Sequence, residues 1–170
     1  MKNKIEKVAV LGAGTMGAQI AGHLANAGIS SCLFDISQEL ADKGVGILST
    51  LKPAPLYKPK NVSLIEACNY DDHLDKIKDA DWIVEAVAEK LDIKHSVYNN
   101  IADYIKNTAI IIDAGKGTLE KKAYDIAYKR NIKIFRTDVT ASLSGLIEKS
   151  IVMEKIVEKN FNLVGTNLRS

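Results

Sequence analysis

A glycine-rich turn between a short apolar run and a helical pattern constrains the fold of this chain more than any other feature. The apolar run Lys7–Leu11 leads directly into the sequence GAGTMG at residues 12–17, and a helical pattern begins at once. A second apolar run, residues 29–34, ends at Asp35. Strand, glycine turn, helix, strand and acidic residue in this order form one βαβ unit, and this order predicts a dinucleotide-binding fold.

Each glycine of this turn has a distinct physical role in holding a pyrophosphate. The first permits a tight turn, the second lets the backbone approach the phosphates, and the third lets the helix lie close to the sheet. The N–H groups at the start of the helix have no partner within it, and the helix dipole favours an anion there. We therefore expect NAD to contact Gly12, Gly14, Thr15, Met16 and Gly17.

Asp35 is the candidate for selecting the nucleotide. It lies about 20 residues beyond the glycine turn, the spacing expected of an acid that binds the adenine ribose hydroxyls. A carboxylate there favours NAD and repels the additional phosphate of NADP, and Ile36 and Ser37 offer no arginine to reverse that preference. The alternative is that Asp35 caps the next helix.

Apolar runs alternate with helical patterns along most of the chain. We therefore expect an α/β, Rossmann-like, doubly wound fold with a mostly parallel sheet of about six strands and helices on both faces. We expect residues 1–170 to form one dinucleotide-binding domain. The further strands are expected at residues 62–68, 81–87, 109–112 and 132–135, and the helices at residues 16–27, 37–50, 91–105, 118–130 and 147–158, with a short helix from Asp71 or Asp72 to Lys78.

All three prolines of the chain lie within residues 53–59, so residues 52–60 are predicted to form a loop. Its lysines, Lys52, Lys58 and Lys60, are suited to an anionic substrate, and a solvated basic loop is the alternative. The net charge of +2 and the absence of a basic stripe argue against nucleic acid as a partner.

No stretch of the sequence has the length of a membrane span, and no signal peptide is recognisable, so we expect a cytoplasmic protein without a membrane partner. Cys32 and Cys68 stand alone in apolar runs. Because the CxxC spacing is absent, buried reduced thiols are favoured over a disulfide or a metal pair, and no metal site is expected.

Residues 5–112 closely resemble the N-terminal domain of the 3-hydroxyacyl-CoA dehydrogenases. The glycine turn and the sequence AGHLANAG at residues 21–28 match, and the segment KIKDADWIVEAVAEKLDIK at residues 76–94 is the most diagnostic. The resemblance implies NAD-dependent oxidation of a (3S)-3-hydroxyacyl-CoA to the 3-ketoacyl-CoA. It also implies that Glu89 and Lys94 join Asp35 around NAD, and that the proline loop lies towards the CoA.

The last third of the chain departs from the pattern of that family. The family has a His-Glu pair after the sixth strand, because the hydroxyl proton needs a base with a pKa near neutral and a carboxylate to orient it. Here Asp138 stands in the place of the histidine, and Glu148 is the nearest candidate for the partner acid. An ionised aspartate is a weak base at pH 7 unless burial raises its pKa. Lys116, after the fifth strand, is either an NAD contact, a catalytic lysine or a solvated loop residue.

Three hypotheses follow from these residues. In the first hypothesis, the chain is a dehydrogenase of this family that acts alone, as a fragment or with a separate helical subunit. A separate subunit is considered because we expect the family's helical substrate domain to be absent here. Alternatively it is an NAD-binding sensor or regulatory subunit without hydride chemistry. The third hypothesis is a dehydrogenase for another small hydroxy substrate. Because a bare sheet leaves the nicotinamide side of the cleft open, we also expect a homo-oligomer or a partner, bound through apolar residues between 146 and 157.

Overall fold

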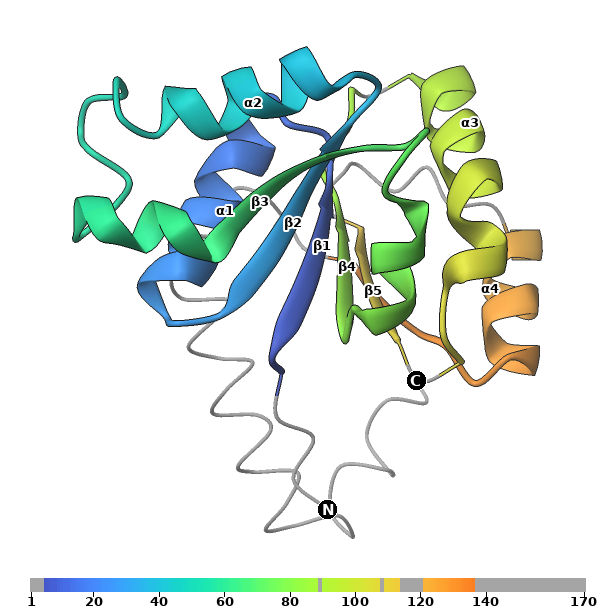
Figure 1. Cartoon of the computed structure of the whole chain (residues 1–170). Helices are drawn as coiled ribbons and strands as arrows, with labels where there is room; N and C mark the ends of the chain where they lie inside the picture. Colours follow the sequence, from blue (N-terminus) through green and yellow to red (C-terminus); the bar gives the residue numbers. More distant parts are fainter. Residues whose placement is uncertain (1–4, 89, 108, 114–120, 137–170) are drawn as a thin grey trace, which may run out of the picture. The chain divides into compact units, whose positions relative to one another are not determined.

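The computed structural model describes residues 5–88, 90–107, 109–113 and 121–136. Six strands form a single parallel sheet in the order β3-β2-β1-β4-β5-β6. This order, in which the chain starts at the centre and winds outward in both directions, confirms the predicted Rossmann-like fold (Figure 1). The strands are β1 (Lys7–Leu11), β2 (Ser30–Asp35), β3 (Ile65–Asn69), β4 (Trp82–Glu85), β5 (Ile110–Asp113) and β6 (Lys133–Arg136).

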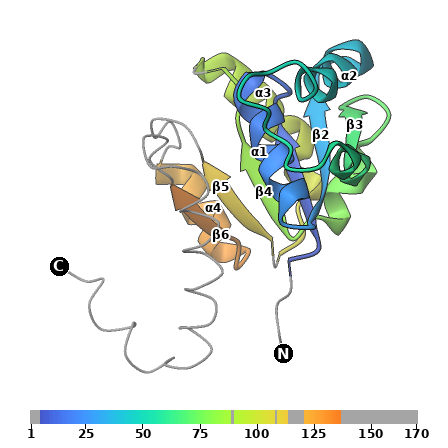
Figure 2. The same ribbon diagram turned by 90° about the vertical axis from the view of Figure 1, so that its left-hand side faces the viewer.

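Helices cover both faces of the sheet. Figure 1 shows α1 and α2 on one side and α3 and α4 on the other, and Figure 2 shows α4 beside β5 and β6. None of the helices in the described part of the chain is long and apolar enough to cross a membrane. The α-helices are α1 (Thr15–Asn26), α2 (Gln38–Ile47), α3 (Leu91–Ile101) and α4 (Lys121–Lys129), and the 3-10 helices are η1 (Pro59–Leu64), η2 (Leu74–Asp79) and η3 (Ala102–Tyr104).

The core lies on both faces of the central strands, because helices pack on each side of a parallel sheet. Residues Val8–Leu11 of β1 are all fully buried, and successive side chains point to opposite faces. On one face, Ala9 and Leu11 join Val97 and Ile101 of α3 in the main apolar cluster. The other face receives α1 through its glycine-rich first turn.

Several element boundaries differ from those expected. The helix predicted over residues 37–50 ends as α2 at Ile47, and the strand predicted from residue 62 begins at Ile65 because a proline-initiated 3-10 helix occupies Pro59–Leu64. The helix predicted to residue 105 ends at Ile101 and continues as a 3-10 turn. The predicted helix over residues 147–158 lies outside the described residues.

The predicted cap of the short helix after β3 is wrong. His73, rather than Asp71 or Asp72, precedes η2, and its side chain makes no capping hydrogen bond. Asp72 is engaged elsewhere, because its backbone N–H donates to Asn69 Oδ1 (2.8 Å) and its carboxylate accepts from Asn69 Nδ2 (3.0 Å). The two residues form a small polar turn at the carboxyl end of β3.

Candidate functional site

The carboxyl ends of β1 and β4 lie side by side at the point where the strand order reverses. The backbone N–H of Ala86, directly after β4, donates to the carbonyl oxygen of Leu11 at 2.8 Å. The segment after β4 is therefore held against the start of the glycine turn. In doubly wound sheets, ligands bind in the crevice at such a reversal.

Two glycines of the turn are required by the packing of the chain itself. Gly12 has a φ of +102°, and a Cβ there would lie 2.8 Å from the carbonyl oxygen of Ala86. A Cβ on Gly17 would lie 1.8 Å from the carbonyl oxygen of Gly12. Gly12 therefore sets the turn after β1, and Gly17 allows α1 to pack directly against that turn.

Gly14 is glycine for a different reason. Its φ of −66° suits any residue, and a Cβ there would meet no atom within 4 Å among the described residues. The space over Gly14 is open, and Thr15 and Met16 beside it are exposed. No acidic side chain lies in the first turn of α1. The turn thus offers free backbone N–H groups, a positive helix end and room for a close approach, which is the fit that a pyrophosphate requires.

Asp35 lies at the end of β2 and is bonded to this same turn. Its Oδ2 accepts from the N–H of Ala13 and its Oδ1 from the N–H of Ile36, both at 2.8 Å. Asp35 does not cap α2, because Ser37 accepts from the N–H of Leu40 in that role. Each carboxylate oxygen has a second lone pair, so Asp35 retains acceptors for the hydroxyls of a ribose.

Lys94 forms a buried ion pair with Glu85. Its Nζ lies 2.7 Å from Glu85 Oε2, with exposed fractions of 2% and 1% for the two side chains. Glu85 Oε1 also accepts from the N–H of Val87 at 2.8 Å. An unpaired charge is costly in a protein interior, so removing either partner should destabilise the fold. The pair lies at the carboxyl end of β4, and the expected contact of Lys94 with NAD remains a prediction.

Sequence reasoning assigned no role to Glu85. The signal that points to it is an acidic residue inside an otherwise apolar strand, at the edge of the sheet where ligands bind. Parallel strands buried on both faces carry few charges, so an acid at such a position needs a specific partner.

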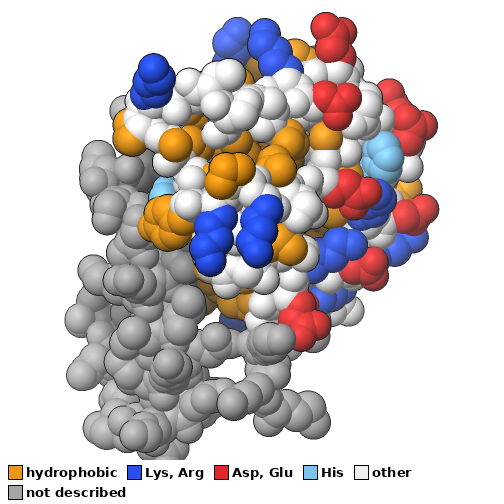
Figure 3. Space-filling view, turned by 60° about the vertical axis from the view of Figure 1, so that its left-hand side comes forward, with side chains coloured by type: hydrophobic (Ala, Val, Ile, Leu, Met, Phe, Trp, Pro, Cys, Tyr) orange, Lys and Arg blue, Asp and Glu red, His pale blue; other side chains and the backbone are white. Residues whose placement is uncertain are grey.

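Asn26, another residue without an assigned role, fastens the proline loop to α1. Its Nδ2 donates to the carbonyl oxygen of Pro55 (2.8 Å), and its Oδ1 accepts from the N–H of Tyr57 (2.9 Å) and from Asn61 Nδ2 (3.2 Å). One side-chain amide thus fixes the loop at two points and η1 at a third. Lys52, Lys58 and Lys60 of the loop are all exposed, which agrees with both interpretations of these lysines. Figure 3 brings the left-hand side of Figure 1 forward and shows basic side chains among hydrophobic ones, with acidic side chains close to several of them.

The remaining candidate residues, Glu89, Lys116, Asp138 and Glu148, lie outside the described residues. The three histidines of the chain lie within them: His23 on α1, His95 on α3, and His73 before η2, where its Nδ1 accepts from the N–H of Asn69 at 3.2 Å. All three precede β5 in the chain, whereas the expected base would follow β6.

Comparison with known proteins assigns the family. The profile of the 3-hydroxyacyl-CoA dehydrogenase NAD-binding domain matches residues 7–115. The chain is 44% identical over 121 residues to a Deinococcus radiodurans protein named "Probable 3-hydroxyacyl-CoA dehydrogenase". The aligned region covers 67% of this chain and 35% of the relative. The chain is 35% identical over 173 residues to a Rickettsia felis protein named as a trifunctional enzyme of a fatty acid oxidation complex, covering 94% of this chain and 24% of the relative.

Solved structures agree on the fold. The (S)-3-hydroxybutyryl-CoA dehydrogenase of Ralstonia eutropha superimposes with a TM-score of 0.64 at 24% identity, over 78% of this chain and 49% of that one. The chain thus spans about half or less of the length of each of these proteins. It belongs to the 3-hydroxyacyl-CoA dehydrogenase family, of which it carries the NAD-binding domain, and NAD is the cofactor of that domain.

Proposed function

We propose that this chain takes part in the NAD-dependent oxidation of a 3-hydroxyacyl-CoA to the 3-ketoacyl-CoA. One observation carries the proposal: the open space over Gly14 lies in the same turn that Asp35 holds through the N–H of Ala13. The chain's own packing does not demand a glycine at that position, whereas a bound pyrophosphate does. The two residues therefore serve the phosphates and the ribose of one dinucleotide.

The reaction needs two transfers from the substrate. The hydroxyl proton passes to a base of the protein, and the hydrogen on C3 leaves with its electron pair as hydride, which NAD accepts when bound. We assign the proton to Asp138, oriented by Glu148, with Lys116 as the alternative acceptor. Glu89 and Lys94 complete the NAD site, and the lysines of the proline loop meet the phosphates of CoA.

A calorimetric titration with NAD, NADH and NADP tests the cofactor assignment. We expect saturable binding of NAD and NADH and weaker binding of NADP. NADH formation is then followed by absorbance with 3-hydroxyacyl-CoA thioesters of several chain lengths, and with small free hydroxy acids as the competing substrate class. Turnover of the thioesters supports the proposal, and turnover of the free acids alone refutes the assignment of substrate.

A second candidate function is NAD binding without hydride transfer, as a sensor or regulatory subunit. The aspartate at position 138 favours it, because an ionised carboxylate is a weak base at pH 7. NAD binding without turnover of any substrate, alone or with a helical subunit added, would support this candidate. A gain of thioester oxidation in Asp138→His would instead indicate a catalytic site that lacks only its base.

We further propose that a helical substrate domain or subunit closes the nicotinamide side of the site, and that the chain works in the cytoplasm. Relatives named as subunits or multifunctional proteins of fatty acid oxidation support such an assembly. Co-purification with a helical partner, or a dimer in sedimentation, is the expected result; a lone monomer argues against the assembly.

A further inference from the structure

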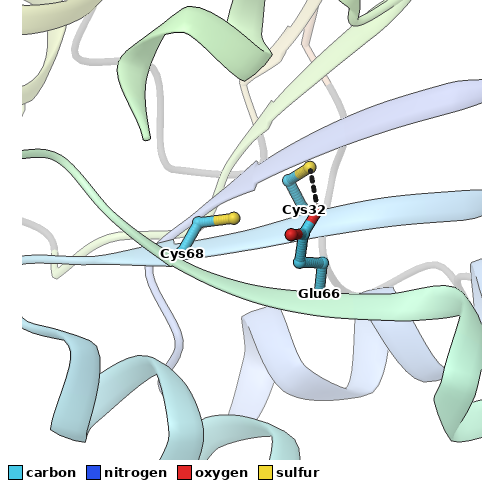
Figure 4. A group of neighbouring side chains, drawn as sticks. All are labelled: Cys32, Glu66 and Cys68. Atoms are coloured by element: carbon cyan, nitrogen blue, oxygen red, sulfur yellow. Dashed lines mark hydrogen bonds between the residues drawn. The ribbon is translucent and has the colours of Figure 1, made fainter. Parts of the chain in front are cut away.

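Strand pairing brings together three side chains that are far apart in the sequence. Cys32 lies on β2, and Glu66 and Cys68 lie on β3, the edge strand. Cys32 pairs with Glu66 in the register of the sheet, and Cys68 is two residues farther along the same strand. Residues two apart on a strand share a face, so all three side chains lie on one side of the sheet. Their sulfur and oxygen atoms lie within 4.8 Å of one another. Figure 4 shows the three side chains on the two neighbouring strands.

We propose that Cys32, Glu66 and Cys68 form a binding site for a thiophilic divalent cation of the Zn²⁺ class. Two thiolates and one carboxylate are ligands that such a cation accepts, and a water completes four-coordination. Sulfur atoms on a tetrahedral zinc lie about 3.8 Å apart, given Zn–S bonds of about 2.3 Å. Because the three donor atoms already converge, small rotations of the side chains suffice to close the site.

The strand geometry favours a cation over a disulfide. Neighbouring strands are about 4.8 Å apart and two residues rise about 6.6 Å, so Cα atoms at diagonal positions are separated by about 8 Å. A disulfide without backbone movement requires less than about 7 Å. Both cysteines are free thiols. A metal ion between the two sulfur atoms spans this separation, whereas an S–S bond does not.

The charges around the three residues suit the bound form. Glu66 Oε1 pairs with the ammonium of Lys76, which leaves Oε2 facing Cys32 Sγ at 3.9 Å. Two thiolates and a carboxylate around a divalent cation carry one net negative charge, and Lys76 offsets it. Binding converts two thiols and M²⁺ into M(SR)₂ and two released protons.

Access to the site comes from the edge of the sheet. Cys32 and Cys68 are 2% and 0% exposed, whereas the side chain of Glu66 is 56% exposed. A cation therefore reaches the carboxylate first and the thiols afterwards. The site lies in the body of β2, before its carboxyl end at Asp35, so it is distinct from the glycine turn.

Cobalt absorption tests the proposal directly. The reduced full chain, kept in a phosphine reductant that does not chelate metals, is titrated with Co²⁺ and then with Zn²⁺. We expect a thiolate-to-cobalt charge-transfer band and tetrahedral d–d bands, both abolished when Zn²⁺ displaces Co²⁺. Cys32→Ser and Cys68→Ser should each remove one thiolate contribution, and Glu66→Gln should weaken affinity roughly 10- to 100-fold. Glu39→Gln, an exposed carboxylate of α2, is the matched control and should bind as the parent does.

A second measurement does not depend on the variants folding. In the unaltered protein, the buried thiols are alkylated only when the edge strand opens, and bound Zn²⁺ should slow this alkylation of both thiols, as followed over time by mass spectrometry. The proposal is overturned if cobalt binds without a thiolate band, if both serine variants keep full zinc affinity, or if zinc leaves alkylation unchanged. It is equally overturned if the reduced protein binds no cation and the two cysteines only form a disulfide on oxidation.

Discussion

At the scale of single residues, the glycine turn contains glycines that serve two different purposes. Gly12 and Gly17 are set by contacts within the chain, whereas Gly14 faces open space. A methyl group therefore has different consequences at the two kinds of position. At Gly12 or Gly17 the methyl group disturbs folding, whereas at Gly14 it disturbs only the approach of a ligand.

We expect Gly14→Ala to fold normally and to weaken NAD binding by roughly tenfold or more, equivalent to about 1.4 kcal/mol. Gly17→Ala places a methyl group against the carbonyl oxygen of Gly12, so it should lower the unfolding temperature. Thermal unfolding by circular dichroism and calorimetric NAD titration separate the two effects. A Gly14→Ala protein that binds NAD as tightly as the parent would contradict our assignment of the open space.

Asp35 contributes both a charge and two hydrogen bonds to the turn. Asp35→Asn removes the charge and keeps one carbonyl acceptor, so the turn should survive while the preference for NAD over NADP falls by about tenfold. Parallel calorimetric titrations with the two nucleotides measure that ratio. Asp42→Asn, an exposed carboxylate on α2, should leave the ratio unchanged. An unaltered ratio in Asp35→Asn would show that the carboxylate does not select the nucleotide.

The sequence predicted the positions of the turn and of Asp35 because their roles depend on local order and spacing. It did not predict that the ammonium of Lys94 pairs with Glu85, since the pairing depends on α3 packing behind β4. The nearness of Cys32 and Cys68 escaped sequence reasoning for a similar reason. Their separation in the chain is large, and only the register between β2 and β3 brings the sulfur atoms together.

At the scale of elements, α2 packs on the glycine turn through Gly44. A Cβ at this position would lie 2.5 Å from the carbonyl oxygen of Ala13. Gly46, two residues later in the same helix, faces open space among the described residues. Gly44 and Gly46 of α2 therefore form a matched pair for substitution by alanine, one in close contact with the turn and the other in open space.

We expect Gly44→Ala to destabilise the protein by about 1–3 kcal/mol through overpacking. Gly46→Ala should stabilise it by about 0.5–1 kcal/mol, because alanine loses less backbone entropy than glycine in a helix. Denaturant unfolding of the two variants measures both changes. Equal effects of the two substitutions would mean that α2 does not rest on the turn.

The helix ends that are marked by a capping side chain or by a glycine were predicted correctly. Gly28 has the positive φ of +78° expected just after α1, and Ser37 caps α2 as expected. The 3-10 helices were not predicted, since they are too short for apolar periodicity to appear. They account for the late start of β3 and for the early end of the helix that begins at Leu91.

At the scale of the whole molecule, Asp81 joins three strands at the amino end of the sheet. Its carboxylate accepts from the N–H groups of Glu6 (2.9 Å) and Lys7 (3.2 Å) and from Lys106 Nζ (2.7 Å). Its own backbone bonds to Lys7 and Ile110. Burial by itself raises the pKa of Asp81, but the Lys106 ammonium and the two backbone donors outweigh it, so the pKa is lower than usual.

This direction determines how stability depends on pH. A carboxylate with a lowered pKa in the folded state stabilises the protein above its ordinary pKa, and that contribution is lost as the pH falls through the lowered value. Asp81→Asn should therefore reduce stability at neutral pH and reduce the further loss on acidification. Unfolding temperatures measured from neutral to acidic pH check this expectation, with Asp71→Asn at an exposed site as control. Parallel acid profiles for Asp81→Asn and the parent would contradict it.

The doubly wound parallel sheet was predicted from the alternation of apolar runs and helical patterns, whereas the order of its strands is known from the structure. The catalytic end of the site was less predictable. Its candidates, Lys116, Asp138 and Glu148, stand in segments whose residues depart from the pattern that identified the rest. Local patterns therefore predict which residues hold the nucleotide, and experiments on turnover must decide whether the chain oxidises a substrate.

The hydrogen bond from the N–H of Ala13 to Asp35 has a consequence for how NAD arrives. The protein's own carboxylate holds the glycine turn in place before any ligand is bound, so this part of the site needs no ordering when NAD binds. The conformational entropy of ordering the glycine turn is then lost during folding and does not reduce the affinity for NAD.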